Sequence, residues 1–193
     1  MGSPAQVRDA RYTYADYLTW SDDERWELID GVAYNMTPAP SRKHQKISWE
    51  LSQQIGAHLR GKKCQAYTAP FDVRLPAPGE VDDTTGTVVQ PDMVVVCDPA
   101  KLDDRGCKGA PDLVIEIVSP ESVARDMKEK FLLYERAGVA EYWIVHPIDR
   151  VVSIFHRGPD GFYGKPDVHT AEERVPVGVL QGLEIDLSAV FSE

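Results

Sequence analysis

The sequence has no long apolar run, and this absence argues against a membrane-spanning helix. No stretch of the 193 residues approaches the roughly 20 apolar residues that such a helix needs. Residues 1–11 contain no apolar segment of signal-peptide length, so secretion is not indicated. We expect a cytoplasmic protein without a membrane partner. A chain of 21.5 kDa with 42% hydrophobic residues suits one domain, residues 1–193, with a single well-buried core.

Cysteine is scarce, and the three cysteines show no recognisable spacing. Cys64, Cys97 and Cys107 are an odd number and include no C-x-x-C pair. This argues against a disulfide framework and against a cysteine-rich zinc site. We therefore expect free thiols, buried or partly buried, in a reducing compartment.

Several enzyme motifs are also missing. The sequence has no P-loop, G-x-G-x-x-G, H-E-x-x-H or G-x-S-x-G pattern. The net charge is −10, and an acidic surface repels phosphate backbones, so composition alone points away from nucleic acid. One segment is the exception: residues 41–63 contain six basic residues and one acidic residue. That segment is either a local phosphate contact or a solvated helix face.

Helix and strand signals are mixed and do not follow a regular β-α-β order. A capping box at Thr13 and Asp16 predicts a short helix that buries Tyr14, Tyr17 and Leu18. Residues 26–36 resemble a hairpin that turns at Asp30-Gly31. The other predicted helices cover 41–60, with an apolar stripe, and 122–137, with Met127, Phe131 and Tyr134 on one face. Strands are predicted over 64–75, with a break at Pro70, and over 88–97, 112–118 and 141–146, with a mobile connection over 99–110. Residues 151–156 and 162–169 are predicted to form an antiparallel pair.

The most informative feature is a pair of carboxylates inside apolar strands. Alternation places Asp92 on the face of Val94 and Val96, and Glu116 on the face of its neighbours two residues away. A carboxylate in a central strand is costly unless a metal, a basic partner or hydrogen bonds satisfy it. If the strands are neighbours, Asp92 and Glu116 can converge on Mg²⁺ or Mn²⁺, which prefer oxygen ligands. The alternative is a structural role in which each acid pairs with Lys or Arg.

The predicted helix after Glu116 supplies a basic candidate. Asp126, Lys130 and Tyr134 are four residues apart and form one stripe. Lys130 can therefore lean toward Glu116, where its ammonium would steady a phosphate or orient an attacking water. The simpler alternative is an Asp126–Lys130 pair within the helix, worth a few tenths of a kcal/mol.

Pro91-Asp92 followed by Glu116 resembles the PD-(D/E)XK nuclease superfamily. That pattern ends in Glu-x-Lys, whereas position 118 here is Val. A lysine displaced to the following helix is a variation within the superfamily. Lys130 fits this variation, with Lys128 as the weaker choice.

The resemblance becomes closer with the Uma-type family of restriction-endonuclease-like proteins. It covers residues 12–187, which would form the core of the domain. The segments that carry it are residues 26–31, His44, Pro91-Asp92, residues 112–120, Asp126, Lys130, Tyr134 and residues 137–147. His146 is a departure, because family members usually have Asp there; we expect it to lie outside the catalytic centre.

The family resemblance implies an α/β fold with a restriction-endonuclease-like mixed central β-sheet, flanking helices and additional β-hairpins. It also implies that Asp92, Glu116 and the backbone carbonyl of Ile117 hold the metal. Glu27 would be a further acid near the metal, and His44 would approach the site. A Glu before a turn is more often exposed, and a His at a helix start is more often a cap or surface residue.

We therefore expect a Mg²⁺- or Mn²⁺-dependent endonuclease, acting on DNA rather than RNA, with catalytic residues Asp92, Glu116, Lys130 and Glu27. The basic segment would guide the nucleic-acid backbone. One alternative is a non-catalytic binding or regulatory module with a nuclease fold, which the acidic net charge favours. Another is an accessory or toxin-like protein that acts on a protein partner. Apolar hairpins near the C-terminus are compatible with a homodimer.

Overall fold

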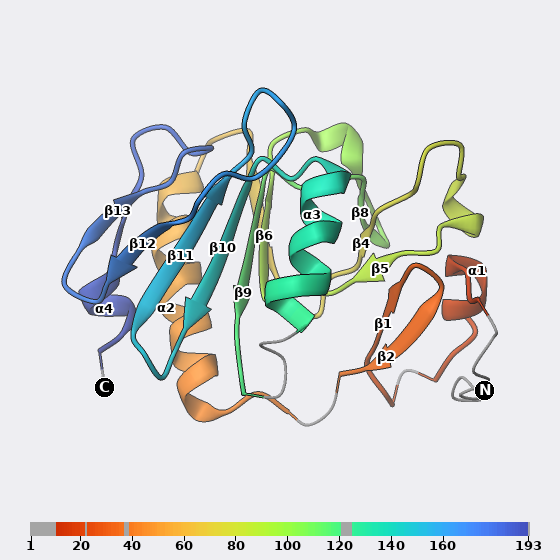
Figure 1. The fold of residues 1–193 in the computed structure, drawn as a ribbon, viewed down its shortest axis with the longest axis horizontal. Coiled ribbons are helices and arrows are strands. Elements are labelled where there is room, and N and C mark those ends of the chain that lie inside the picture. Colours follow the sequence, from red (N-terminus) through yellow and green to blue (C-terminus); the bar gives the residue numbers. More distant parts are fainter. Residues whose placement is uncertain (1–10, 22, 37–38, 121–124, 193) are drawn as a thin grey trace.

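Two six-stranded sheets form the framework of the molecule in a computed structural model (Figure 1). The structure describes residues 11–21, 23–36, 39–120 and 125–192, without the side chains of Arg125 and Asp126. Within these ranges, no helix combines the length and the apolar character needed to cross a membrane. The fold is mixed α/β with helices on both faces of the main sheet, as the sequence predicts. The strands are divided between two six-stranded sheets and one separate pair.

The main sheet has the strand order β12-β11-β10-β9-β6-β3. Only β9 and β10 pair in parallel within it, and the other neighbours are antiparallel. The strands are β3 (Gln65–Thr68), β6 (Met93–Val96), β9 (Leu113–Ile117), β10 (Glu141–His146), β11 (Val151–His156) and β12 (Asp167–Thr170). A separate pair, β13 (Arg174–Pro176) and β14 (Glu184–Asp186), precedes the short helix α4 (Leu187–Val190).

The second sheet has the order β2-β1-β5-β4-β8-β7. Its strands are β1 (Trp26–Ile29), β2 (Val32–Asn35), β4 (Val73–Arg74), β5 (Val88–Val89), β7 (Leu102–Asp103) and β8 (Gly106–Lys108). β4 and β8 are parallel, and the remaining pairs are antiparallel. The hairpin β1–β2 is the predicted one, and its tight turn uses positive φ at Asp30 and Gly31.

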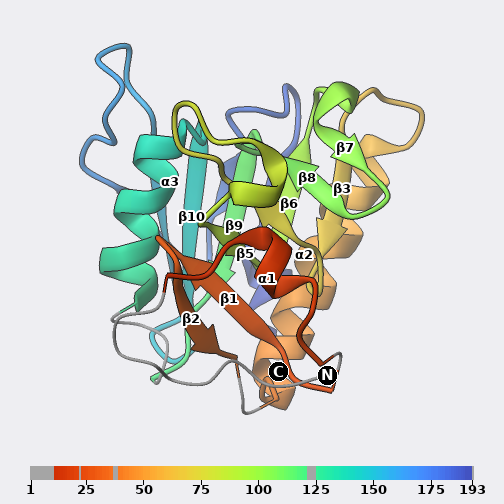
Figure 2. The ribbon, with the colours of Figure 1, turned by 90° about the vertical axis from the view of Figure 1, so that its right-hand side faces the viewer.

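Helices α2 (Arg42–Leu59) and α3 (Phe131–Ala137) lie on opposite faces of the main sheet, which Figures 1 and 2 show from two directions. The predicted apolar stripe of α2 packs on one face, and its members Ile47, Leu51, Ile55 and Leu59 are buried. α3 packs on the other face in a core that also includes residues of the second sheet, such as Val73 and Val89. The main sheet is therefore buried on both sides.

Helix starts follow the predicted caps. The Thr13 capping box begins α1 (Tyr14–Tyr17), and the Ser41 hydroxyl accepts a hydrogen bond from the amide of His44 at the start of α2. Two expected core positions are wrong, because Leu18 and Met127 are about half exposed. The short α1 ends before Leu18, and Met127 belongs to a π-helical turn, Arg125–Lys130, whose wider spacing displaces it from the α-helical stripe.

One segment predicted as a single strand divides between the sheets, since residues 88–97 form β5 and then β6. Residues 64–75 form β3 and then β4, and the predicted break at Pro70 is present, where the Ala69–Pro70 bond is cis. The connection over 99–110 is also more ordered than predicted, since it forms a 3₁₀ turn (Pro99–Lys101) and the β7–β8 hairpin. The strand expected over 162–169 is shorter and later, at β12.

The expectation of three free thiols is also wrong. Cys64 and Cys97 form a disulfide, and only Cys107 is a free, buried thiol. The antiparallel register pairs Gln65 with Val96, so the two cysteines lie opposite each other just beyond the paired ends of β3 and β6. Sequence spacing could not reveal this pairing, because the register of two strands decides it.

Candidate functional site

The chain crosses from the second sheet to the main sheet at Gln90, Pro91 and Asp92. β5 ends at Val89 and β6 begins at Met93, so Asp92 lies at the entrance to the main sheet. Met93 pairs with Ile115 in the antiparallel register, which places Asp92 opposite Glu116. Asp92, directly before β6, and Glu116, in β9, therefore meet the condition of neighbouring strands, at the end of the sheet where β9 finishes.

Asp92 is the acid that solvent reaches. Its side chain is 20% exposed, and Oδ2 accepts a 2.7 Å hydrogen bond from the backbone amide of Ile117. His44 Nε2 lies 3.1 Å from the same oxygen. His44 belongs to the first turn of α2, which covers the face of the main sheet opposite to α3. Within the described residues Oδ1 makes no hydrogen bond, so one carboxylate oxygen is held and the other is available.

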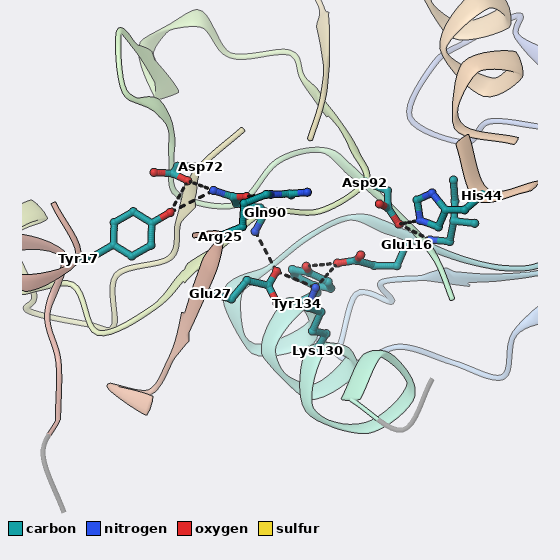
Figure 3. Close-up of polar contacts among 11 residues, drawn as sticks. Tyr17, Arg25, Glu27, His44, Asp72, Gln90, Asp92, Glu116, Lys130 and Tyr134 are labelled. Atoms are coloured by element: carbon teal, nitrogen blue, oxygen red, sulfur yellow. Dashed lines mark hydrogen bonds and ion pairs between the residues drawn. The ribbon is translucent and has the colours of Figure 1, made fainter. Parts of the chain in front are cut away.

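The second group of acids is buried and shares one lysine (Figure 3). Lys130 Nζ lies 2.8 Å from Glu27 Oε1 and 2.9 Å from Glu116 Oε1. All three side chains are at most 6% exposed. The Tyr134 hydroxyl donates a 2.7 Å hydrogen bond to Glu116 Oε1. An ion pair with two carboxylates offsets the cost of burying this ammonium, since an unpaired buried charge is strongly destabilising.

The protonation state of Tyr134 is set by its surroundings. Complete burial, followed by the negative charge of Glu116, raises its pKa well above the usual value. The phenol therefore stays protonated at neutral pH and continues to donate to Glu116. Tyr134 was placed on the stripe of Lys130 by its spacing, and the structure brings both to the same carboxylate oxygen.

Gln90 is a residue of this region that the sequence did not single out. Its backbone amide donates a 2.9 Å hydrogen bond to Glu27 Oε1. Its side-chain amide donates to the Tyr17 hydroxyl and to Asp72, and its carbonyl oxygen accepts from Arg25 (Figure 3). Burial raises the pKa of Asp72. The only sequence signal for Gln90 is its position directly before Pro91-Asp92.

Each predicted site residue can now be located. Lys130 contacts Glu116 as predicted, whereas Lys128 is exposed. Glu27 is fully buried, although a Glu before a turn is more often exposed, because β1 brings it beside Lys130. Ile117 contacts Asp92 through its amide. The predicted Asp126–Lys130 pair lies outside the described side chains.

The donors at this end of the sheet fit a hard cation bound by few protein ligands. Asp92 and Glu116 lie opposite each other, and Glu27 Oε2 is buried without a hydrogen bond within the described residues. No three His, Cys, Asp or Glu side chains converge on one point in the described part of the chain. Mg²⁺ commonly uses one or two carboxylates and keeps several waters, so a site with fewer than three such side chains is compatible with this ion.

One hollow of the molecule lies away from these acids. A pocket of about 740 Å³ is bordered by the β1–β2 turn, residues 75–87 and the end of α3. Neither Asp92, Glu116 nor Lys130 lines it. This pocket is therefore separate from the acids and from Lys130.

Comparisons with known proteins show which family and which fold the chain resembles. The family model described as "Uma2: Putative restriction endonuclease" matches residues 14–188. An uncharacterized protein from Synechocystis sp. is 29% identical over 149 residues, which cover 76% of this chain and 74% of that protein. The crystal structure of a "putative nuclease belonging to DUF820" from Anabaena variabilis has a TM-score of 0.73 at 20% identity, and the match covers 94% of this chain and 98% of that one. The last similarity shows the fold.

Proposed function

Since the chain belongs to the Uma2 family, whose members are described as putative restriction endonucleases, we propose that it is a metal-dependent endonuclease that hydrolyses phosphodiester bonds, with DNA as the expected substrate. One observation carries the proposal most directly. Lys130 is held by Glu27 and Glu116 at the end of the main sheet where Asp92, opposite Glu116, meets solvent.

Asp92 and Glu116, with the carbonyl oxygen of Ile117, would hold Mg²⁺ or Mn²⁺. When bound, such an ion polarises the phosphate and lowers the pKa of a water ligand. Asp92 offers Oδ1, since the amide of Ile117 already fixes Oδ2. Tyr134 orients Glu116 by donating to its Oε1. These contacts fix two carboxylates before the substrate arrives, which lowers the cost of organising the site.

Lys130 would act on the phosphate and on the attacking water. Lys130 is only 3% exposed. Its ammonium lies between two carboxylate oxygens, so two ion pairs fix its position. A positive charge held beside the scissile phosphate stabilises the charge that develops during in-line attack. Glu27 holds Lys130 in place and contributes a further acid near the metal; the amide of Gln90 holds Glu27 in turn.

The exposed face of α2 would guide the nucleic-acid backbone. This helix begins beside Asp92, where His44 contacts the carboxylate, and Arg42, Lys43 and Lys46 lie in its first two turns. None of these three cations forms an ion pair within the described residues. Basic side chains without acidic partners are suited to phosphate contacts, and their proximity to Asp92 favours a path toward the acids.

A plasmid-nicking assay in Mn²⁺ tests the proposal. Wild type is expected to nick supercoiled DNA, and Asp92→Asn is expected to lose activity by at least about a hundredfold. Asp83→Asn is the matched control, because Asp83 is an exposed acid whose side chain makes no hydrogen bond within the described residues. Nicking by Asp92→Asn at the wild-type rate would contradict the proposal.

A non-catalytic binding or regulatory module with a nuclease fold is the second candidate, and the net charge of −10 favours it because nucleases commonly have broad basic surfaces. If the basic residues 41–63 are its contact with nucleic acid, it binds DNA without cleavage in either Mg²⁺ or Mn²⁺. Phosphate contacts would make that binding weaken steeply with added salt. DNA binding by a wild-type protein that nicks no plasmid would support this candidate over the nuclease.

A further inference from the structure

Arg25 is a cation that a neutral side chain holds beside the candidate site. Its Nε and Nη2 atoms donate hydrogen bonds of 3.1 Å and 2.9 Å to the side-chain carbonyl oxygen of Gln90 (Figure 3). These bonds use one edge of the guanidinium fork, and Nη1 donates to no acceptor within the described residues. Arg25 is partly buried and forms no ion pair with an acid of the described chain. The guanidinium is therefore oriented, and part of its donor set is available.

Arg74 shows how this chain treats an arginine with a structural role. Arg74 is fully buried, and its Nη1 and Nη2 atoms lie 2.7 Å and 2.6 Å from carboxylate oxygens of Asp82 and Asp103. Arg25 contacts a carboxamide instead. Gln90 directs its carbonyl oxygen toward Arg25 and its side-chain nitrogen toward Asp72, at 2.9 Å. The amide thus separates the cation from the acid of this network, and no direct contact with a carboxylate compensates the charge of Arg25.

The backbone places Arg25 close to the acids of the candidate site. Arg25 and Glu27 are two residues apart at the start of β1, so their side chains project to the same face. Both contact Gln90, Arg25 through the side chain and Glu27 through the backbone amide, and Glu27 also contacts Lys130. The Cα atoms of Gln90 and Asp92 are at most about 7 Å apart, because two residues separate them. The guanidinium therefore lies within a short length of nucleic-acid strand from Asp92.

We infer that Arg25 binds a phosphate of the nucleic-acid strand next to the phosphate that is cleaved. This inference rests on the proposed nuclease function and names a contact of its substrate. A guanidinium fork can donate to two phosphate oxygens at once, and the bond to Gln90 orients the fork before the strand arrives. The charge of Lys130 is shared by two carboxylates, whereas the charge of Arg25 is available to an anion. Such a contact fixes the position of the strand, so that the next phosphate lies at Asp92.

Fluorescence anisotropy with a DNA oligonucleotide and metal-free protein tests the contact without an activity measurement. Arg25→Gln is expected to reduce the slope of log affinity against log salt by about one unit, because one phosphate contact is lost. Arg174→Gln is the matched control, since it removes the same charge from an exposed ion pair on β13, which lies at the far end of the molecule from β1 (Figure 1). Equal affinities and slopes for the two variants would overturn the inference.

Plasmid nicking in Mn²⁺ separates a substrate contact from a positioning role. A phosphate beside the reacting one is held equally before and during cleavage, so Arg25→Gln should raise KM by at least about tenfold and change kcat by less than about threefold. A lower kcat at unchanged KM would show that Arg25 only positions Glu27 and Lys130, and would overturn the inference while the nuclease stands. Wild type that binds DNA with an Arg25-dependent slope but nicks no plasmid would overturn the nuclease and leave the phosphate contact.

Modification of wild type with the arginine reagent phenylglyoxal keeps the inference testable if Arg25→Gln does not fold. Mass spectrometry of the digested protein follows Arg25 and Arg174 separately. With oligonucleotide at about ten times its Kd, modification of Arg25 should slow by about tenfold, because only the unbound protein reacts there, and Arg174 should react as before. Equal modification of Arg25 with and without DNA, or no modification of Arg25 in the free protein, would overturn the inference.

Discussion

At Lys130 a single ammonium group compensates two buried carboxylates. Removing it leaves Glu27 and Glu116 without their cation, and an uncompensated buried charge typically costs about 3–5 kcal/mol. We therefore predict that Lys130→Ala lowers the free energy of unfolding of the metal-free protein by about this amount. Urea denaturation in the presence of a chelator measures it.

Lys128→Ala provides the control for this measurement, because Lys128 is exposed in the same π-helical turn. Its effect should stay within about 0.5 kcal/mol. If Mn²⁺ binds between the acids, it should restore part of the stability that Lys130→Ala loses. Equal stability of the two variants would show that the buried acids do not depend on Lys130.

Cys107 is predicted to be unreactive in the folded protein. Burial raises the pKa of its thiol to about 11, so the reactive thiolate is rare at neutral pH. A thiol-specific colorimetric reagent should therefore detect no thiol in the native protein, one after unfolding without reductant, and three after unfolding with reductant. Three reactive thiols in the unfolded, unreduced protein would contradict the Cys64–Cys97 disulfide.

The residues of the candidate site differ in how far the sequence revealed them. Asp92 and Glu116 were visible because an acid within an apolar strand is conspicuous, and Lys130 because four-residue spacing connects it to Tyr134. Glu27 came only from a family resemblance, since its burial depends on β1 packing beside α3. Gln90 acts through its backbone amide, and no residue pattern reports where a backbone amide points.

At the scale of elements, α2 connects the site to a candidate nucleic-acid surface. Arg42, Lys46, Trp49 and Gln53 are three or four residues apart and share one face, opposite the buried stripe. Trp49 is 66% exposed, whereas the other three tryptophans are at most 8% exposed. An exposed aromatic ring among cations is a suitable platform for base stacking.

This arrangement predicts that nucleic acid quenches the fluorescence of Trp49. Metal-free protein titrated with a DNA oligonucleotide should lose its solvent-exposed emission, and Trp49→Phe should lack the signal. Each phosphate contact contributes about one unit to the slope of log affinity against log salt, so Arg42→Ala with Lys46→Ala should reduce that slope by about two. An unchanged slope would indicate that this face of α2 is only solvated.

The elements themselves were predictable where the signal is local. The Thr13 and Ser41 caps and the Asp30-Gly31 turn depend on neighbouring residues, and all three are present. The division of residues 88–97 into β5 and β6 depends on two different sheets, and no local preference records it. Local preference also fails to predict the strand in residues 99–110, because β8 forms there only by pairing with β4, which is distant in the sequence.

For the whole molecule, the buried tyrosines determine how the free energy of unfolding should respond to alkaline pH. Burial raises the pKa of Tyr14, Tyr17, Tyr134 and Tyr163. A raised pKa in the folded state favours the neutral phenol, so this contribution to stability is complete below about pH 10 and is lost as pH rises beyond it. Absorbance titration should show roughly half of the eight tyrosines ionising only when the protein unfolds. Ionisation of all eight at the ordinary pKa with retained structure would contradict the packing.

The division into two sheets is the feature of the whole molecule that the sequence predicted least well. A mixed sheet with flanking helices and hairpins was expected, and all of these are present. The strands of the second sheet have two to four residues, too short for a clear alternation of apolar and polar positions. Their pairing across 26–108 is a property of the tertiary fold, yet it is this sheet that brings Glu27 to Lys130.

Calorimetric titration of Mn²⁺ into wild type and Asp92→Ala tests whether Asp92 and Glu116, opposite each other at the end of the main sheet, form a metal centre. We expect saturable binding by wild type, and binding by Asp92→Ala that is at least about tenfold weaker. Equal binding by the two proteins, or no binding by wild type in the presence of DNA, would contradict it and leave the acids with a structural role.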